Sequence, residues 1–194
     1  DEAKLRGTAI VRPNGMTGLG VLSLKDANLS ADLFQFKRWE ANSDTANFNL
    51  KNTYPEADED PLSFKTDNVN ARLSFSERKG VFKSNDGEST VEFPINQYIC
   101  KMDMFTWFMD QESVEMAQTG KKDINIDSDL DLAKPNFFSI HPKQDSLQFK
   151  APKANFSLKE KTIYCSKVEY LDVADARIFP DSMKVTVRKR AVMD

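Results

Sequence analysis

The stretch Leu147–Lys150, sequence LQFK, is followed after three residues by Ala154–Leu158, sequence ANFSL. In this pattern two apolar residues flank a polar one, a lysine follows, and an alanine then begins a run with apolar residues at every second position. The same pattern, with longer connections, occurs twice more: Phe34–Lys37 before Ala46–Leu50, and Leu62–Lys65 before Ala71–Phe75. Because the side chains of a strand alternate between its two faces, each stretch predicts a pair of strands with one buried face. A strand pair that recurs with loops of different lengths predicts a repetitive β fold.

Short segments with the same alternation follow one another along the rest of the chain, separated by turns rich in Gly, Asn, Asp, Ser and Pro. No segment has a convincing amphipathic helical pattern. We therefore predict an all-β fold built of repetitive strand units, as a β-solenoid, a β-roll or an elongated jelly roll. A two-sheet β-sandwich is the alternative, since periodicity does not separate these architectures.

The chain is predicted to form one repetitive domain over residues 1–194, or two subdomains that divide near residues 95–120. The apolar stretch Asn96–Asp110 fits a helical turn and a buried strand equally well. The acidic stretch Tyr54–Pro61 is expected to be an exposed loop.

The composition argues against several classes of protein. The chain carries 27 Lys and Arg against 30 Asp and Glu, a net charge of −3. We expect no nucleic-acid partner, because sequence-independent binding to phosphates needs a basic surface. No apolar run approaches the length of a membrane-spanning helix, so the chain is not expected to span a membrane. The chain opens at Asp1 without a Met, and we expect a processed product or a segment of a longer protein.

Two cysteines, Cys100 and Cys165, lie inside apolar stretches at unrelated positions. This placement favours buried free thiols, with a single disulfide bridge as the alternative. Two ligands of this kind do not make a metal site.

The region Asp145–Leu158, continued by Val173–Asp181, resembles segments of the very large β-rich repeat proteins of Bacteroidetes. The resemblance covers most of the chain and implies an internal segment of a longer protein, with neighbouring repeats as its partners. It also implies a cell-envelope location, periplasmic or extracellular, and brings no activity with it. A weaker similarity, in the strand–turn–strand pattern, links the chain to the OstA-like and AsmA-like envelope proteins, β-rolls that carry lipid along an apolar groove.

The sequence offers little site chemistry. His141, the single histidine, precedes Pro142 without a nucleophile motif, so a structural role is expected. Asp127, Asp129 and Asp131 alternate in a way that would suit calcium, but the glycine turn and late glutamate of a calcium loop are absent, which favours a solvated strand face. Among 30 acidic residues no pair stands out as the two carboxylates of a glycosidase. We therefore predict a non-enzymatic protein with no catalytic, cofactor or metal site.

One stretch is a candidate binding surface, because Met and Trp are frequent on adaptable apolar surfaces. The residues predicted to line an apolar ligand groove or an interface are Met102, Met104, Phe105, Trp107, Phe108 and Met109. A core patch between two subdomains is the alternative. Trp39 and Trp107 are the side chains that a glycan-binding surface would expose.

Three functions follow from these observations. The first is a non-enzymatic envelope module that acts as a scaffold or carries an amphipathic, lipid-like ligand. The second is a β-solenoid that binds or processes glycans, and the third is a structural adhesin repeat. The partners expected are neighbouring repeats, with lipid or glycan as the ligand class.

Overall fold

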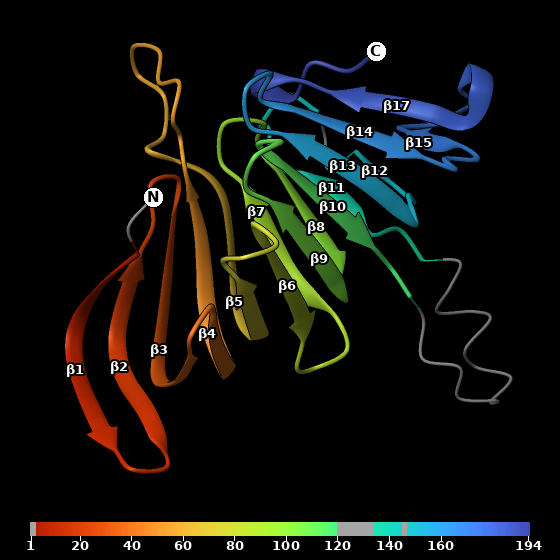
Figure 1. Cartoon of the computed structure of the whole chain (residues 1–194). Coiled ribbons are helices and arrows are strands. Elements are labelled where there is room, and N and C mark those ends of the chain that lie inside the picture. Colours follow the sequence, from red (N-terminus) through yellow and green to blue (C-terminus); the bar gives the residue numbers. More distant parts are fainter. Residues whose placement is uncertain (1–2, 120–133, 145–146) are drawn as a thin grey trace, which may run out of the picture.

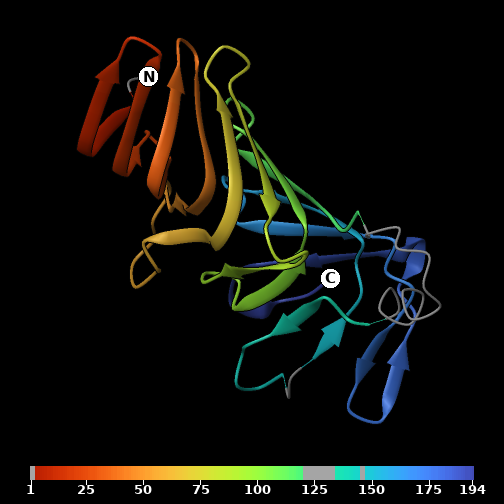
Figure 2. The same ribbon diagram turned by 90° about the horizontal axis from the view of Figure 1, so that it is seen from below.

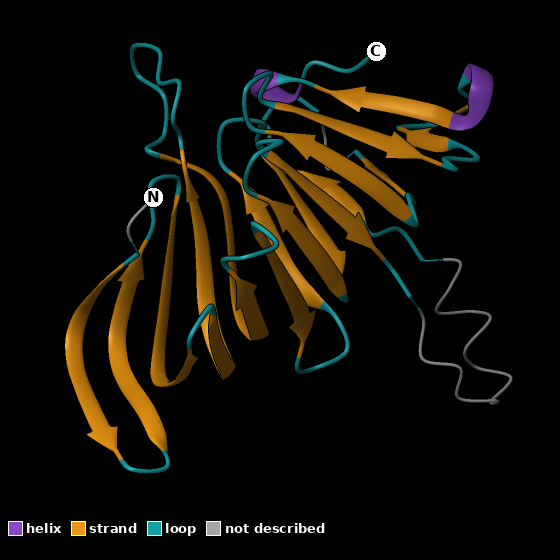
Figure 3. Cartoon of the chain, viewed as in Figure 1, coloured by secondary structure: helices purple, strands orange, loops and turns teal. Residues whose placement is uncertain are grey.

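The computed structural model describes residues 3–119, 134–144 and 147–194, and these form one antiparallel sheet of seventeen strands. The all-β prediction is confirmed, and the described residues contain no α-helix, because the purple helical segments in Figure 3 are 3₁₀ turns. Two single 3₁₀ turns, Asp181–Met183 and Lys189–Ala191, lie near the C-terminus. The sheet does not close on itself, because β1 pairs only with β2 and β16 pairs only with β15 among the described strands.

The first five strands are long and pair in chain order (Figure 1). They are β1 (Lys4–Arg12), β2 (Gly15–Ser23), β3 (Ala27–Lys37), β4 (Glu40–Lys51) and β5 (Leu62–Ser74). Their inward-facing side chains are apolar at every second position, as in β4, where Ala46, Phe48 and Leu50 are all buried. This alternation is the reason for the strands, since it gives a pleated surface one apolar face.

The long strands bend along one line, which we call the crease. β3 pairs with β4 through Ala27–Ser30 and again through Gln35–Lys37, with a break between the two ladders. Register shifts also interrupt the β2–β3 and β4–β5 ladders, and Asn68 in β5 has a positive φ of 50°. Bulges bend a strand and increase its twist. These irregularities therefore fold the sheet across the middle of each long strand.

Two opposed glycines extend the crease into β1 and β2. A Cβ atom on Gly7 would lie 1.9 Å from the carbonyl oxygen of Leu19, and one on Gly20 would lie 2.3 Å from that of Arg6. Gly20 also has a φ of 120°, which side chains disfavour. Only glycine permits this close approach of the two backbones.

The sheet divides at β5 into two arms. Lys65 and Thr66 pair with β7, whereas Val69–Ser74 pair with β6. Arm A consists, in pairing order, of β6 (Lys79–Ser84), β9 (Met104–Phe108), β10 (Ser113–Ala117), β13 (Lys153–Ser157), β14 (Thr162–Ser166) and β17 (Lys184–Val187). Arm B consists of β7 (Ser89–Phe93), β8 (Tyr98–Met102), β11 (Phe137–Ser139), β12 (Gln148–Phe149), β15 (Leu171–Val173) and β16 (Ala176–Ile178).

The two arms face each other and enclose the core (Figure 2). Phe93 of arm B packs edge-on against Phe156 of arm A, with their ring centroids 5.1 Å apart. The inner faces are lined by aromatic side chains that are at most 2% exposed: Phe48, Phe64, Phe82, Phe93, Phe105, Trp107, Phe137, Phe149 and Phe156. The high Phe content therefore fills the space between the arms, and one core cluster continues on both sides of residues 95–120.

The recurring sequence pattern does not always correspond to a strand pair. The second stretch, predicted as two strands, is the single strand β5, which crosses the crease from arm B to arm A. The third also passes from arm B to arm A, but as two strands, β12 and β13, separated by Lys150–Pro152. The first forms the β3–β4 hairpin instead. The helical alternative for Asn96–Asp110 is wrong, because β8 and β9 lie there.

Candidate functional site

The side of the fold opposite the crease is bordered by two rows of hairpin turns. The first row, which we call lip A, consists of the turns at residues 38–39, 75–78, 109–112 and 158–161, the first between β3 and β4 and the others leading into or lying within arm A. Backbone hydrogen bonds join successive turns of this row, from Phe75 to Trp39, from Met109 to Arg78 and from Leu158 to Glu112. Lip B is formed by the turns at the same side of arm B and of the strands that lead into it: Leu24–Asp26, Asn52–Pro61, Pro94–Gln97 and Ile140–Gln144. Access to the apolar interior depends on what lies between the two lips.

Asn52–Pro61, the strap, reaches from lip B to lip A. Its base is held by the bond from the Asn52 N–H to the Pro61 carbonyl, 2.8 Å. Near its start, the Tyr54 hydroxyl donates to the Glu112 carboxylate in lip A, at 2.9 Å to Oε2. The prediction of an exposed loop at Tyr54–Pro61 is confirmed, since every residue of that stretch except Glu59 is exposed. The structure adds that this loop is fastened across the open side.

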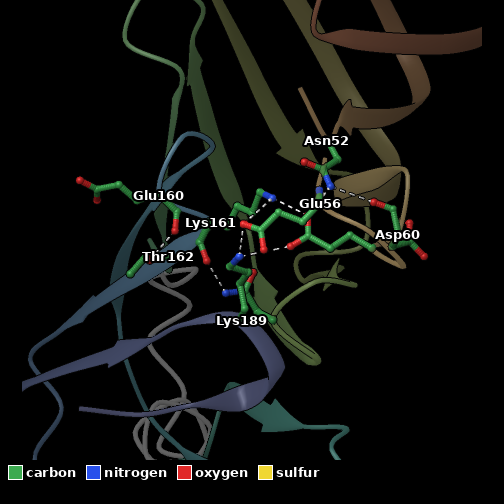
Figure 4. A network of polar contacts seen from close by, with 9 residues as sticks. Asn52, Glu56, Asp60, Glu160, Lys161, Thr162 and Lys189 are labelled. Carbon is green, nitrogen blue, oxygen red and sulfur yellow. Dashed lines mark hydrogen bonds and ion pairs between the residues drawn. The ribbon is translucent and has the colours of Figure 1, made fainter. Parts of the chain in front are cut away.

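A buried ion pair fastens the strap further along (Figure 4). The ammonium group of Lys161, 3% exposed, donates to Glu59, whose side chain is 12% exposed. The Asn52 side-chain amide and the Glu56 N–H also donate to the same carboxylate oxygen, at 2.9 and 3.0 Å. Burial alone would raise the pKa of Glu59, but these hydrogen bonds outweigh it and lower the pKa to about 2. Lys189, a half-buried second cation, contacts Glu56 and lies 3.4 Å from Glu59.

Beneath the strap the two lips touch directly. The buried Asn96 amide in lip B donates to the Lys161 carbonyl at 2.8 Å and to the Val187 carbonyl at 3.2 Å. The C-terminal segment adds two backbone bonds to this hairpin, from Arg190 to Ile95 and from Ala191 to Asn96. The open side is therefore closed along the part of the fold that carries the arms.

The opposite end of the fold, at β1–β3, is open. Leu22, Gly18 and Met16 of β2 share a face, and Gly18 is paired with the fully buried Phe34. Val11 lies opposite Met16 on this inner face, yet Val11 is 77% exposed and Met16 is 38% exposed. The apolar inner face thus continues past the packed core and ends in solvent.

A cavity of about 600 Å³ lies on the open side next to this end. It is lined by Ala3, Arg38, Trp39, Phe75, Arg78 and Asp110. Trp39 is 56% exposed, and the Arg38 guanidinium carbon lies 5.5 Å from the centroid of its ring. Ala3 precedes the residue paired with Ser23, at lip B, whereas the other five belong to lip A. The cavity therefore spans the gap between the lips.

The six residues predicted to line a groove do not lie together on a surface. Four of them, Met102, Phe105, Trp107 and Met109, are buried in the core between the arms. Phe108 is half-buried, and Met104 is exposed on the outer face of arm A. The Trp107 ring packs 5.5 Å from Phe48, centroid to centroid. Of the two tryptophans considered for glycan binding, only Trp39 is accessible.

The remaining candidate residues either take part in a turn or in the core, or lie outside the described ranges. His141 Nδ1 accepts a hydrogen bond from the Lys143 N–H, 3.1 Å, which stabilises a turn. Cys100 and Cys165 are free and buried, and burial raises the pKa of both thiols. The stretch with Asp127, Asp129 and Asp131 lies outside the residues that the structure describes.

Several residues at the site carried no recognisable signal in the sequence. Lys161 and Glu59 are 102 positions apart, and both lie among other charged residues. Asn96 resembles any turn asparagine, although it joins the two lips. Arg38 offered one signal, its position beside a tryptophan in a hairpin.

No protein-family model matches this chain, and no curated protein matches it either. Within the described ranges, no helix is long and apolar enough to cross a membrane. The same ranges contain no cluster of three His, Cys, Asp or Glu side chains that could hold a metal ion.

Proposed function

We propose that the protein is a non-enzymatic module of the cell envelope that holds the hydrocarbon part of an amphipathic molecule against its inner face. The observation that carries this proposal is the exposure of Val11 and Met16 on the same face that buries Phe34. Exposed apolar surface that continues from a core marks a binding surface in a soluble protein. Here it begins where the strap and the C-terminal segment no longer cover the fold.

The architecture supports a repetitive role in a longer assembly. Chain segments that alternate between two facing arms build a β-roll in which each unit buries its apolar face against its neighbours. Among the described strands, nothing pairs with the outer edge of β1, whose nine residues, Lys4–Arg12, are therefore available to a neighbouring strand. The outer face of the sheet next to this edge also has exposed apolar side chains, those of Ile10, Leu19 and Leu33. A neighbouring repeat, of the kind implied by the resemblance to Bacteroidetes proteins, would pair with this edge.

Native mass spectrometry tests the carrier proposal. The purified chain is incubated with palmitate and with lysophosphatidylglycerol, then desolvated gently. The proposal expects adducts of one ligand mass, and it expects Val11→Asp and Met16→Asp to reduce them, because a charge on the inner face opposes burial of a hydrocarbon chain. Ile10→Asp, on the other face of β1, is the matched control. A bare mass with every amphiphile would overturn the carrier proposal and favour a structural adhesin repeat.

Glycan binding is the second candidate, and it rests on the exposed Trp39 ring beside the cavity. An indole ring can stack against the apolar face of a sugar, and Asp110 and Arg78 could bond its hydroxyls. The emission of Trp39, titrated with soluble oligosaccharides, tests this candidate. An unchanged emission spectrum with every saccharide would count against it.

A further inference from the structure

The lining of the Trp39 cavity combines two aromatic side chains, Trp39 and Phe75, with charged groups. Arg38 stacks on Trp39, and among the described residues no carboxylate pairs with its guanidinium group. A guanidinium group has five N–H donors in a planar fork, and contact with an aromatic ring leaves them available to a ligand. It is therefore a preorganised donor for an anion with two or three oxygen atoms.

The six residues that line the cavity carry a net charge of +1, since Arg38 and Arg78 stand against Asp110 alone. Arg78 Nε donates to Asp110 Oδ1 at 3.0 Å, so these two residues offset each other and Arg38 supplies the remaining charge. An anionic group would enter beside Arg38, with Asp110 at the far side of the lining. Asp110 thus opposes the same anion that Arg38 attracts.

The cavity also borders the apolar interior. Phe75 lines it and packs against the hydrophobic core cluster. Leu5 and Phe36, which belong to the same inner surface as Val11 and Met16, pack against that cluster from the open end. A molecule with a charged head in the cavity could therefore place a hydrocarbon chain on the inner face.

From this arrangement we infer that the Arg38–Trp39 cavity binds the anionic head group, a phosphate or a carboxylate, of the amphiphile whose chain lies on the inner face. This inference rests on the proposed carrier function and adds the chemical class of the ligand.

The experiment titrates Trp39 fluorescence with dodecyl phosphate and with dodecyl maltoside, both below their critical micelle concentrations. The two probes share the hydrocarbon chain and differ in the head group. Arg38→Gln should weaken dodecyl phosphate binding about tenfold, as expected for one charge-assisted contact. Asp110→Asn should tighten it, because it removes a repulsive charge. Neither variant should alter the affinity for dodecyl maltoside by more than about twofold, since that head group is uncharged.

Arg177→Gln is the matched control, because Arg177 also stacks on an aromatic ring, Tyr170, at 3.9 Å, but on the edge of arm B. It should leave both affinities unchanged. Opposite effects of the Arg38 and Asp110 variants would support the inference, since general damage to the fold would weaken binding in both. Equal affinity for the two probes, unaltered by Arg38→Gln, would overturn the head-group site while the carrier proposal stands. Absence of binding by either probe would overturn both.

Discussion

Both ends of this folded sheet are built from paired strands with an apolar inner face, but the inner face is buried at one end and exposed at the other. Around the arms, the inner face is filled by aromatic rings, joined across the lips by Asn96 and covered by the strap and the C-terminal segment. At β1–β3 the same inner face has glycines at its bend and leaves Val11 and Met16 in solvent. The arms show that this fold can bury its inner face completely. The exposure at β1–β3 therefore follows from the residues found there.

The two ends also differ at their edges. The outer edge of β17 carries the C-terminal residues, with reciprocal backbone bonds between Thr186 and Asp194 at 2.9 and 3.1 Å. β1 has no such cover among the described residues. Covering an edge prevents pairing with another chain, so a partner strand is expected at β1, which is longer than the other uncovered edge of the described sheet, β16, and not at β17.

The two ends should differ most in the unfolding free energy that is lost when an inner-face side chain is truncated to alanine. Phe93→Ala removes a ring that joins the two arms, and it should lower the free energy of unfolding by about 3–5 kcal/mol, because a large cavity would remain. Val11→Ala should change it by less than about 0.5 kcal/mol, as for other exposed positions. Urea denaturation of both variants measures the two values. Similar costs at both positions would mean that the open end is packed in solution.

The ion pair of the strap tests whether the strap stabilises the closed end of the fold. Lys161→Met removes the buried cation from the Glu59 carboxylate and leaves only Lys189, 3.4 Å from its other oxygen. It should lower the free energy of unfolding by about 3 kcal/mol, the low end of the range for breaking a buried pair. Lys65→Met is the control, since Lys65 and Glu92 form an ion pair about half exposed, and it should cost less than about 1 kcal/mol. Equal and small losses would show that the strap does not close the fold.

Thiol labelling compares access at the two ends. Cys100 and Cys165 are buried, so they should react with a thiol reagent only when the fold opens. A cysteine introduced as Val11→Cys should react at least about a hundredfold faster in the native protein, because it is exposed. Mass spectrometry of the labelled chain gives both rates. Rapid labelling of the native cysteines would contradict the closed interior.

The same ion pair should also make the stability depend on pH. The folded-state pKa of Glu59 lies near 2, below its ordinary value of 4.5, so its contribution is complete above pH 4.5 and is lost as the pH falls toward 2. The difference in unfolding free energy between the native protein and Glu59→Gln should therefore shrink across this range. Denaturation at several pH values measures it. A difference that stays constant across this pH range would mean that an ionised Glu59–Lys161 pair does not stabilise the fold.

Much of the fold could be predicted from local alternation, and little of the site could. The apolar residues of Ala46–Leu50 and Ala154–Leu158 lie on the inner face as predicted, because alternation depends on neighbours in the sequence. The fold of β5 at Asn68 could not be predicted, since a bulge depends on the partner strand. Alternation alone therefore predicts two strands in Leu62–Phe75, where the structure has the single strand β5.

The site depends on contacts between residues distant in the sequence. The strap was recognised as a loop from its composition, but its attachment requires Lys161 from a hairpin 102 positions after Glu59. The aromatic stretch from Met102 to Met109 looked like a binding surface because its composition suits a core and a groove equally. Only the position of arm B opposite arm A buries most of it.

The position of the hydrocarbon chain is the most direct test of the central claim. Tryptophan is introduced as Val11→Trp or as Ile10→Trp in a Trp39→Phe background, with Trp107 as the buried reference. Each variant is titrated with 9,10-dibromostearate, whose bromine atoms quench indole emission on contact. Residues 10 and 11 are adjacent and point to opposite faces of β1. We expect quenching of most of the emission from residue 11 and little quenching at residue 10. Equal quenching at both positions, or none at residue 11, would contradict a ligand held on the inner face.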